Sequence, residues 1–411
     1  MPDRLLPDHL VVWLGSDRVG ELHRERRSLR FIGTPGARGT TSLTVAVDGV
    51  DERWAPGFTR AWFDGLLPEE ERRSAAEREH SVEPGDTFGL LAAIGWECAG
   101  AVSILPETVA PASGTYHPLD DAEVWERLDA LPRVVSPIDH AVRLSLGGAQ
   151  NKLLLARLGD RWHLPIEGAT STHILKPEPE RYPGLAVAEA WSLAVASAVT
   201  KTAKASLEAP TGHRPTLVVD RYDRHIHANG MTRLHQEDGC QVLGLSPGDK
   251  YPRGAGPREA SLARIAGVLF ARAVDPPGEL GRLLEQVVVN IALLNTDAHA
   301  KNVSVIHTGA GTVSLSPLYD VAPTLWFLPT LRRVALPVGE KWVIAEITRR
   351  HLLAEARVWG IPEAPAQATI TRALDALRVG MVEADGRYPD LPPDLRATVD
   401  RNVKRLEESS F

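Results

Sequence analysis

The sequence is poor in cysteine and in long apolar runs. Its 411 residues contain two cysteines, Cys98 and Cys240, which excludes a disulfide framework and a cysteine-cluster zinc site and is typical of a reducing cytoplasm. The apolar run at 10–14 is too short for a signal peptide core. The apolar stretches at 185–199 and 287–294 are interrupted or too short for a membrane span, which needs about 20 apolar residues. We therefore expect a cytoplasmic protein without a membrane segment.

An excess of positive charge is also absent. The chain has 46 Lys and Arg residues against 53 Asp and Glu, which gives a net charge of −7. Such a balance argues against a protein that coats nucleic acid by itself, because that binding needs a basic surface. Lysine is scarce: only 8 of the 46 basic residues are Lys, and none precedes Lys152. Where arginine is the default, a lysine indicates a use for its compact ammonium group.

The length indicates two or three domains, at about 150 residues each. We expect domain boundaries at 1–132, 133–245 and 246–411. The first part reads as a small α+β region, with a β-branched strand at 43–47. The second part alternates short strands and glycine turns around one apolar helix. The third is mostly helical, and its segment at 279–294 has the pattern of a central buried helix.

The sharpest chemical signal lies at residues 295–302, which read NTDAHAKN. Asp297 and Asn302 are five residues apart, the spacing of the base and the metal ligand in a kinase catalytic loop. A carboxylate can accept the proton of an attacking hydroxyl, and an amide oxygen can bind magnesium. Lys301 could stabilise phosphate charge and His299 could hold the loop. The alternative is a polar helix end, because this spacing also occurs by chance.

A predicted β-hairpin adds a second carboxylate to this loop. The strands at 303–307 and 313–315 flank a glycine-rich turn, and Asp320 follows the second strand. Because antiparallel pairing brings both ends of a hairpin to one side, Asp297, Asn302 and Asp320 should converge. Two carboxylates and an amide form an oxygen site suited to magnesium with nucleotide phosphates. The alternative is that Asp320 only caps a turn.

Two further elements precede this loop in the order found in two-lobed kinases. A short strand at 172–176 ends in Lys176, whose ammonium would neutralise phosphate oxygens. The next helix, at 185–199, carries Glu189 among apolar residues, and a buried carboxylate needs a partner such as this lysine. The glycine-containing segment at 145–152 is typical of a phosphate-covering loop. Taken alone, it would be read as a plain hairpin turn.

These segments together resemble the HipA-like serine/threonine kinases of bacterial toxin–antitoxin modules. The resemblance covers nearly the whole chain in order, and NTDAHAKN with SLGGAQNK is its most specific part. The matching segments are SLGGAQNK at 145–152, STHILK at 171–176, DRYDR at 220–224, QEDGCQVLG at 236–244, NTDAHAKN at 295–302, LYDV at 318–321, and more loosely VGEL at 19–22, FDGLL at 63–67 and GAV at 100–102.

The resemblance implies an α+β, two-lobed protein-kinase-like fold related to phosphoinositide kinases. It adds an N-terminal α+β subdomain and a mostly helical C-lobe. The implied activity is ATP- and Mg²⁺-dependent phosphorylation of a protein of translation, such as an aminoacyl-tRNA synthetase. The implied partner is a HipB-like helix-turn-helix antitoxin, and DNA would be reached only through that antitoxin.

The resemblance also assigns roles to individual residues. Asp297 would be the catalytic base, with His299 and Lys301 beside it, and Asn302 and Asp320 would bind magnesium. In the family the serine that heads the glycine loop is autophosphorylated, which displaces the loop and silences the kinase; here that serine is Ser145. The segment from Asp220 to Tyr222 would form the adenine-binding hinge. The implied nucleotide-binding residues are Ser145, Gly147, Gly148, Ala149, Gln150, Lys152, Lys176, Glu189, Asp220 and Tyr222.

Two departures from the family pattern and two alternative functions remain. Gly147 stands where an alanine is expected and Asn151 where an acidic residue is usual; neither removes a catalytic group.

The spacing of Asp297, His299 and Asn302 also resembles the loop of aminoglycoside and choline phosphotransferases, which lack the SLGGAQNK element. A catalytically weak corepressor acting through an antitoxin is the third interpretation, and the intact acidic and amide residues argue against it.

Overall fold

The computed structural model of the chain describes residues 7–25, 28–34, 43–45, 54–111, 114–131, 151–227, 230–254, 256–309 and 311–411. The chain divides into two compact units that each combine distant parts of the sequence. Unit 1 contains Met1–Pro177, Asp220–Gly248 and Ile306–Thr312, and unit 2 contains Glu178–Val219, Asp249–Val305 and Val313–Phe411. Within the described part of the chain, every helix is too short or too polar to span a membrane.

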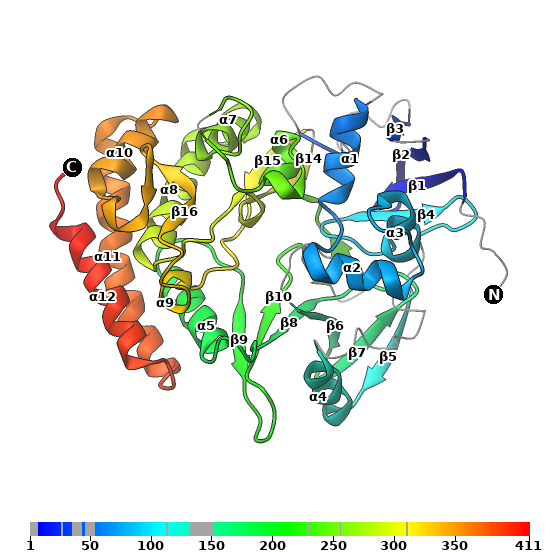
Figure 1. Ribbon diagram of the computed structural model, residues 1–411, viewed down its shortest axis with the longest axis horizontal. Helices are drawn as coiled ribbons and strands as arrows, with labels where there is room; N and C mark the ends of the chain where they lie inside the picture. The colour runs from blue at the N-terminus through cyan, green and yellow to red at the C-terminus, as the bar shows by residue number, and fades with distance from the viewer. Residues whose placement is uncertain are drawn as a thin grey trace. The chain divides into compact units, whose positions relative to one another are not determined.

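Unit 1 begins with a four-stranded antiparallel sheet in the order β3-β2-β1-β4, with helices α1 to α3 beside it (Figure 1). Its core contains the fully buried side chains of Leu10, Leu22, Trp62, Phe63 and Phe88, which join the strands to helices α1 and α3. The elements are β1 His9–Leu14, β2 Asp17–Arg24, β3 Leu29–Gly33, α1 Pro56–Asp64, α2 Glu70–Glu79, α3 Thr87–Ile94 and β4 Val102–Pro106.

The rest of unit 1 is built on a second antiparallel sheet, in which β5, β7, β6 and β8 are neighbours in that order. Helix α4 starts with a capping box, in which Asp120 and Glu123 exchange side-chain and backbone hydrogen bonds. The elements are β5 Thr115–Leu119, α4 Asp121–Ala130, β6 Leu153–Leu158, β7 Arg161–Ile166, β8 His173–Pro177, β11 Arg224–His227, β12 Gly230–Arg233, β13 Gln236–Asp238 and α6 Gly239–Leu243.

The strand expected at 43–47 is wrong in its described part, because residues 43–45 form no strand. Their backbone groups bond to side chains instead of to a neighbouring strand. The amide of Val45 donates to the Glu237 carboxylate at 2.9 Å, and His235 donates to the carbonyl of Leu43 at 2.8 Å. Side-chain partners thus satisfy the backbone that a sheet would otherwise satisfy.

Unit 2 is mostly helical, and its longest helix, α11, packs against α8, α5, α10 and α12 (Figure 1). Gly380 lets α11 approach α5 closely, since a Cβ at this position would lie 2.6 Å from the Val195 carbonyl oxygen. The elements are α5 Leu185–Ala196, β9 Ala205–Glu208, β10 Thr216–Asp220, α7 Leu262–Arg272, α8 Pro276–Ala292, α9 Thr324–Phe327, β16 Arg333–Val338, β17 Lys341–Val343, α10 Arg349–Val358, α11 Glu363–Arg387 and α12 Pro393–Glu408, with 3-10 turns at Ala300–Asn302 and Ile344–Glu346. A further 3-10 turn, Pro247–Asp249, lies at a crossing of the chain from unit 1 to unit 2.

The predicted hairpin and the predicted central helix are both present. Strands β14 (Ser304–Gly309) and β15 (Thr312–Leu315) are neighbours in a three-stranded sheet with β13. Helix α8 covers most of the segment expected at 279–294, and the side chains from Val287 to Ala292 are buried. The segment that carries the NTDAHAKN motif connects this helix to the hairpin. Its first residue therefore follows closely on a helix that is buried in the core of unit 2.

Candidate active site

The NTDAHAKN segment starts with a sharp change of chain direction at the end of α8. Leu294 has a φ of 60°, in the left-handed region that residues with a side chain rarely adopt. The amide of Asn295 donates to the carbonyl of Asn290 at 2.9 Å, and the amide of Leu325 donates to the carbonyl of Leu294 at 3.2 Å. These bonds hold a costly backbone conformation in place, so the direction of the following residues is fixed.

Asn295 joins the two flanks of the hairpin through its side chain. It is buried, with 2% of its surface exposed. Its Oδ1 accepts a hydrogen bond from the amide of Asp297 at 3.1 Å, and its Nδ2 donates to the carbonyl of Asp320 at 3.3 Å. One amide therefore ties together the backbones of the two predicted site carboxylates.

A second amide closes the loop on itself. Nδ2 of Asn302 donates to the carbonyl of Asp297 at 3.1 Å, and the backbone amide of Asn302 donates to the carbonyl of His299 at 2.9 Å. Because the amide nitrogen of Asn302 is engaged with the protein, its oxygen is the end of the side chain that can bind a cation. The predicted base and the predicted amide ligand thus belong to one compact turn.

Tyr319 connects the far flank of the hairpin to the same turn. Its hydroxyl donates to the carbonyl of Lys301 at 2.6 Å and lies 2.6 Å from the hydroxyl of Ser304. The next residue, Asp320, has a φ of 60°, which changes the chain direction directly at the predicted metal ligand. The hairpin geometry thus brings its two flanks together, as antiparallel pairing predicts.

His299 and Lys301 are buried rather than solvated, with 9% and 8% of their surfaces exposed. Burial of a lysine is uncommon, because its ammonium loses hydration. The burial of Lys301 therefore argues against a solvated surface lysine, which is the plain alternative to a role beside the phosphates.

Tyr251 covers the predicted base. Its hydroxyl donates to Oδ1 of Asp297 at 2.6 Å, and its ring packs edge-on against the ring of His299 with centroids 5.2 Å apart. Tyr251 itself faces solvent, since 44% of its surface is exposed. A hydroxyl group therefore already lies where the base would meet the hydroxyl of a substrate. Sequence reasoning did not assign this residue, because it precedes Asp297 by 46 positions.

The predicted nucleotide-binding residues are distributed over both units. Lys176 is buried in β8 of unit 1, and Glu189 is buried in α5 of unit 2. Their pairing stays a prediction. Oδ1 of Asp220 lies 3.2 Å from Nε2 of His173, and Tyr222 donates a hydrogen bond to Gln236.

Of the glycine-containing segment at 145–152, the structure describes the last two residues. Lys152 directly precedes strand β6 and is half-buried. The remaining predicted residues of this loop lie outside the described residues; they are Ser145, Gly147, Gly148, Ala149 and Gln150.

The DRYDR segment contributes to a buried charged network in unit 1 that sequence reasoning did not find. Arg221 donates to Glu97 at 2.9 Å and holds both oxygens of Asp223 at 3.1 and 2.9 Å. Arg224 donates to Glu97 at 2.5 Å, and Arg233 donates to the carbonyls of Cys98 and Val102 beside it. Glu97 is fully buried, so these contacts compensate for its lost hydration.

The network lowers the pKa of its two carboxyl groups. Burial alone would raise both values, but Arg221 and Arg224 together hold the pKa of Glu97 and that of Asp223 below their usual range. The three arginines outnumber the two carboxylates, so the network needs both carboxylates ionised.

This pKa shift predicts that the fold loses stability in acid. A carboxyl group with a lowered pKa in the folded state contributes stability above its unfolded pKa of about 4, and the contribution is lost as the pH falls through the folded value. We therefore expect the melting temperature to fall steeply below about pH 4. Thermal melts followed by circular dichroism from pH 7 to pH 3 would measure it. An equally steep fall in a Glu97→Gln variant would show that Glu97 contributes nothing to this pH dependence.

Comparisons with known proteins identify the same family as the sequence motifs. A family model described as HipA-like C-terminal domain matches residues 144–380, and one described as HipA N-terminal domain matches residues 10–105. The chain is 34% identical over 379 residues to putative kinase Y4mE of Sinorhizobium fredii, covering 89% of each protein. It is 26% identical over 363 residues to the serine/threonine-protein kinase toxin HipA of Shewanella oneidensis, covering 86% of this chain and 82% of that protein.

A solved structure has the same fold. A chain from the toxin–antitoxin complex of HipA, HipB and operator DNA of Shewanella oneidensis MR-1 matches with a TM-score of 0.80. The match covers 97% of this chain and 95% of that chain, at 24% sequence identity. The expected α+β, kinase-like fold is therefore confirmed.

Proposed function

The chain belongs to the HipA-like family of serine/threonine kinases, and on that premise we propose that it is an ATP- and Mg²⁺-dependent protein kinase acting as a toxin. The observation that carries the proposal is the pair of hydrogen bonds made by Asn295, which hold the backbones of Asp297 and Asp320 together. Fixed carboxylates are what phosphoryl transfer needs, because its catalysis depends mostly on positioning and charge neutralisation.

In this proposal Asp297 orients the acceptor hydroxyl and takes its proton. Asn302 and Asp320 would hold the magnesium, and the oxygen donors that they offer fit this hard cation. The bound ion supplies neutralisation of the charge on the nucleotide phosphates. Lys301 and His299 lie in the same turn, where the lysine adds positive charge and the histidine contributes its backbone to the loop.

The nucleotide-binding role is assigned to residues of both units. Lys176 and Lys152 would neutralise phosphate oxygens, and Glu189 would hold the first of these lysines. The segment from Asp220 to Tyr222 would bind the adenine. Autophosphorylation at Ser145 would displace the glycine loop and switch the kinase off.

The proposed macromolecular partners follow from the family. A HipB-like helix-turn-helix protein is the proposed antitoxin, since the similar solved chain occurs in a complex with HipB and operator DNA. DNA would be reached only through that antitoxin, which agrees with the net charge of −7. The proposed substrate is a cytoplasmic protein of translation, such as an aminoacyl-tRNA synthetase.

A labelled-phosphate transfer assay tests the proposal against the alternative of a small-molecule phosphotransferase. The purified chain is incubated with γ-labelled ATP, with and without Mg²⁺, and with either a protein extract or a metabolite extract. Label should enter protein only when Mg²⁺ is present, and mass spectrometry should find phosphate on Ser145. Label transferred only to metabolites, or no turnover of ATP, would contradict the proposal.

The contact between Tyr251 and Asp297 predicts that this tyrosine slows the reaction. A substrate hydroxyl must displace the Tyr251 hydroxyl from the carboxylate, and a hydrogen bond to a charged group contributes about 1.5–3 kcal/mol. We expect Tyr251→Phe to raise kcat/KM for the protein substrate by about ten-fold, which corresponds to the lower end of this range, mainly through a lower KM. Steady-state kinetics would measure it.

Tyr182→Phe serves as the matched control, because Tyr182 packs edge-on against Phe327 in the same unit and this packing needs no hydroxyl. Its kinetics should equal those of the unaltered chain. A kcat/KM that falls in Tyr251→Phe would show that the hydroxyl assists the base rather than blocking it.

A further inference from the structure

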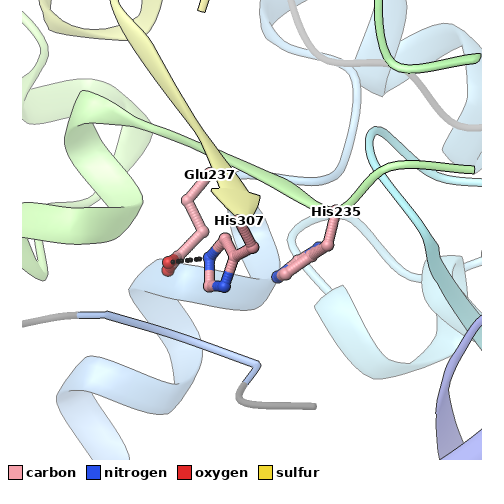
Figure 2. A group of neighbouring side chains, drawn as sticks. All are labelled: His235, Glu237 and His307. Carbon is pink, nitrogen blue, oxygen red and sulfur yellow. Dashed lines mark hydrogen bonds and ion pairs between the residues drawn. The ribbon is translucent and has the colours of Figure 1, made fainter. Parts of the chain in front are cut away.

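Two histidines and a glutamate form a buried group in unit 1, apart from the residues assigned to phosphoryl transfer. His235 and Glu237 come from the segment around β13, and His307 comes from the neighbouring strand β14 (Figure 2). One donor atom from each residue lies within 4.8 Å of the other two. Glu237 is fully buried and His235 is 6% exposed. It is the one group of three His, Cys, Asp or Glu side chains with such spacing in the described part of the chain.

Two of the three donors are a hydrogen-bond length apart, about 0.4 Å less than the separation that two ligands of one metal ion require. Nε2 of His307 lies 2.9 Å from Oε2 of Glu237 (Figure 2). Zinc binds nitrogen and oxygen donors at 2.0–2.2 Å, so two ligands of a tetrahedral ion lie about 3.3 Å apart. Since all the separations are within 4.8 Å, the third donor needs to move by at most about 1.5 Å to complete the set.

The surroundings of the group hold its members in place. Oε1 of Glu237 accepts a hydrogen bond from the Trp62 indole at 2.7 Å, and Oε2 accepts one from the amide of Val45 at 2.9 Å. Metal-binding carboxylates and histidines are oriented by such outer contacts. His235 donates to the carbonyl of Leu43 through Nε2, at 2.8 Å.

Of the two ring nitrogens of His235, only Nε2 makes a hydrogen bond within the described residues. Its buried Nδ1 meets no hydrogen-bond partner within the described residues. Buried polar atoms are nearly always paired, and an exception needs an explanation. The ring also lies beside that of His307, with centroids 4.3 Å apart. Since donor atoms of both rings belong to the set that lies within 4.8 Å of one another, one ion can reach both rings.

We propose that His235, Glu237 and His307 form a binding site for a single divalent transition-metal ion of the zinc class. Two imidazole nitrogens and one carboxylate oxygen are the protein ligands of many zinc sites, and water can occupy the fourth position. The described chain offers no thiolate in this set, which disfavours softer ions.

The ion has a structural role in this proposal. It joins the segment around β13 to β14, and through the outer contacts of Glu237 and His235 it fastens residues 43–45 to both strands. Because bound metal stabilises the folded state and not the unfolded chain, loading should raise the melting temperature.

Zinc loading of the full chain tests the site directly. The purified protein is stripped with a chelator, incubated with ZnCl₂ alone, desalted and analysed for metal by mass spectrometry. We expect about one zinc per chain and a higher melting temperature than in the stripped protein. Cobalt(II) in place of zinc should give the visible absorption of a four-coordinate ion. A stripped chain that retains no zinc after loading would overturn the proposal, whatever any variant does.

Two sets of variants show whether zinc binds to this buried group or to histidines on the surface. His307→Gln and His235→Gln each keep an amide that can donate to the present partner, so the fold has a substitute for each lost bond. Zinc content should fall at least five-fold in both. The control is the double variant His225→Asn, His227→Asn, which removes an exposed pair of stacked rings on β11. Loss of zinc from this control, with full retention in both glutamine variants, would assign the metal to the surface and overturn the proposal.

Discussion

Asp297→Asn is expected to reduce phosphate transfer by about 100- to 10,000-fold, the range that a general base contributes. Asparagine keeps the shape of the side chain and the backbone bonds of the turn, but its amide cannot take the proton of the acceptor hydroxyl. Autophosphorylation with γ-labelled ATP measures the loss. Because the side chain is half-buried and an amide oxygen can still accept the hydrogen bond from Tyr251, the melting temperature should stay unchanged.

The matched control for this variant is Asp375→Asn, which alters an exposed carboxylate on α11. Its transfer rate should equal that of the unaltered chain. Binding of ATP to Asp297→Asn, measured by calorimetry, should also be retained, since the base contacts the acceptor rather than the nucleotide in the proposed mechanism. Near-normal autophosphorylation of Asp297→Asn would remove Asp297 from the reaction.

Glu97→Gln is expected to have the largest effect on stability. The substitution leaves Arg221, Arg224 and Arg233 buried with Asp223 as the remaining carboxylate of the network. Removing one partner of a buried ion pair typically costs about 3–5 kcal/mol of unfolding free energy, because the other charge stays buried without compensation. Urea denaturation of the purified chain would measure this loss.

Glu107→Gln provides the control for that substitution. Glu107 lies in the same unit, and its side chain is 59% exposed beside Arg18 at 3.9 Å. Exposed ion pairs contribute about 0–1 kcal/mol, so this variant should unfold at nearly the same urea concentration as the unaltered chain. Equal stability of Glu97→Gln and Glu107→Gln would mean that the arginines find other partners.

Local features of the chain could be predicted from the sequence, because neighbouring residues determine them. The hairpin after the NTDAHAKN segment follows from two β-branched strands around a glycine turn, and α8 follows from its apolar periodicity. The family could be recognised because its motifs are short and occur in a fixed order. The roles of Asp297, Asn302 and Asp320 stay predictions that the proposed assays test.

The contacts that lie far apart in the sequence could not be predicted. Glu97 is 124 positions before its partner Arg221, and neither lies in a pattern that names the other. The strand expected at 43–47 failed for the same reason, since Leu43 and Val45 bond to side chains 192 positions away. Asn295 belonged to a recognised motif, but its role depends on Asp320 across the hairpin.

The buried network has a consequence for any attempt to recombine this protein with its relatives. Glu97 lies in the part that matches the N-terminal family model, whereas Arg221 and Arg224 lie in the part that matches the C-terminal one. A chimera that takes its first hundred residues from another member still contains Arg221 and Arg224 from this chain. The N-terminal part from the other member must then provide a carboxylate at the place of Glu97. In this chain the two parts are therefore not interchangeable modules, because the charge balance of the buried network depends on residues from both.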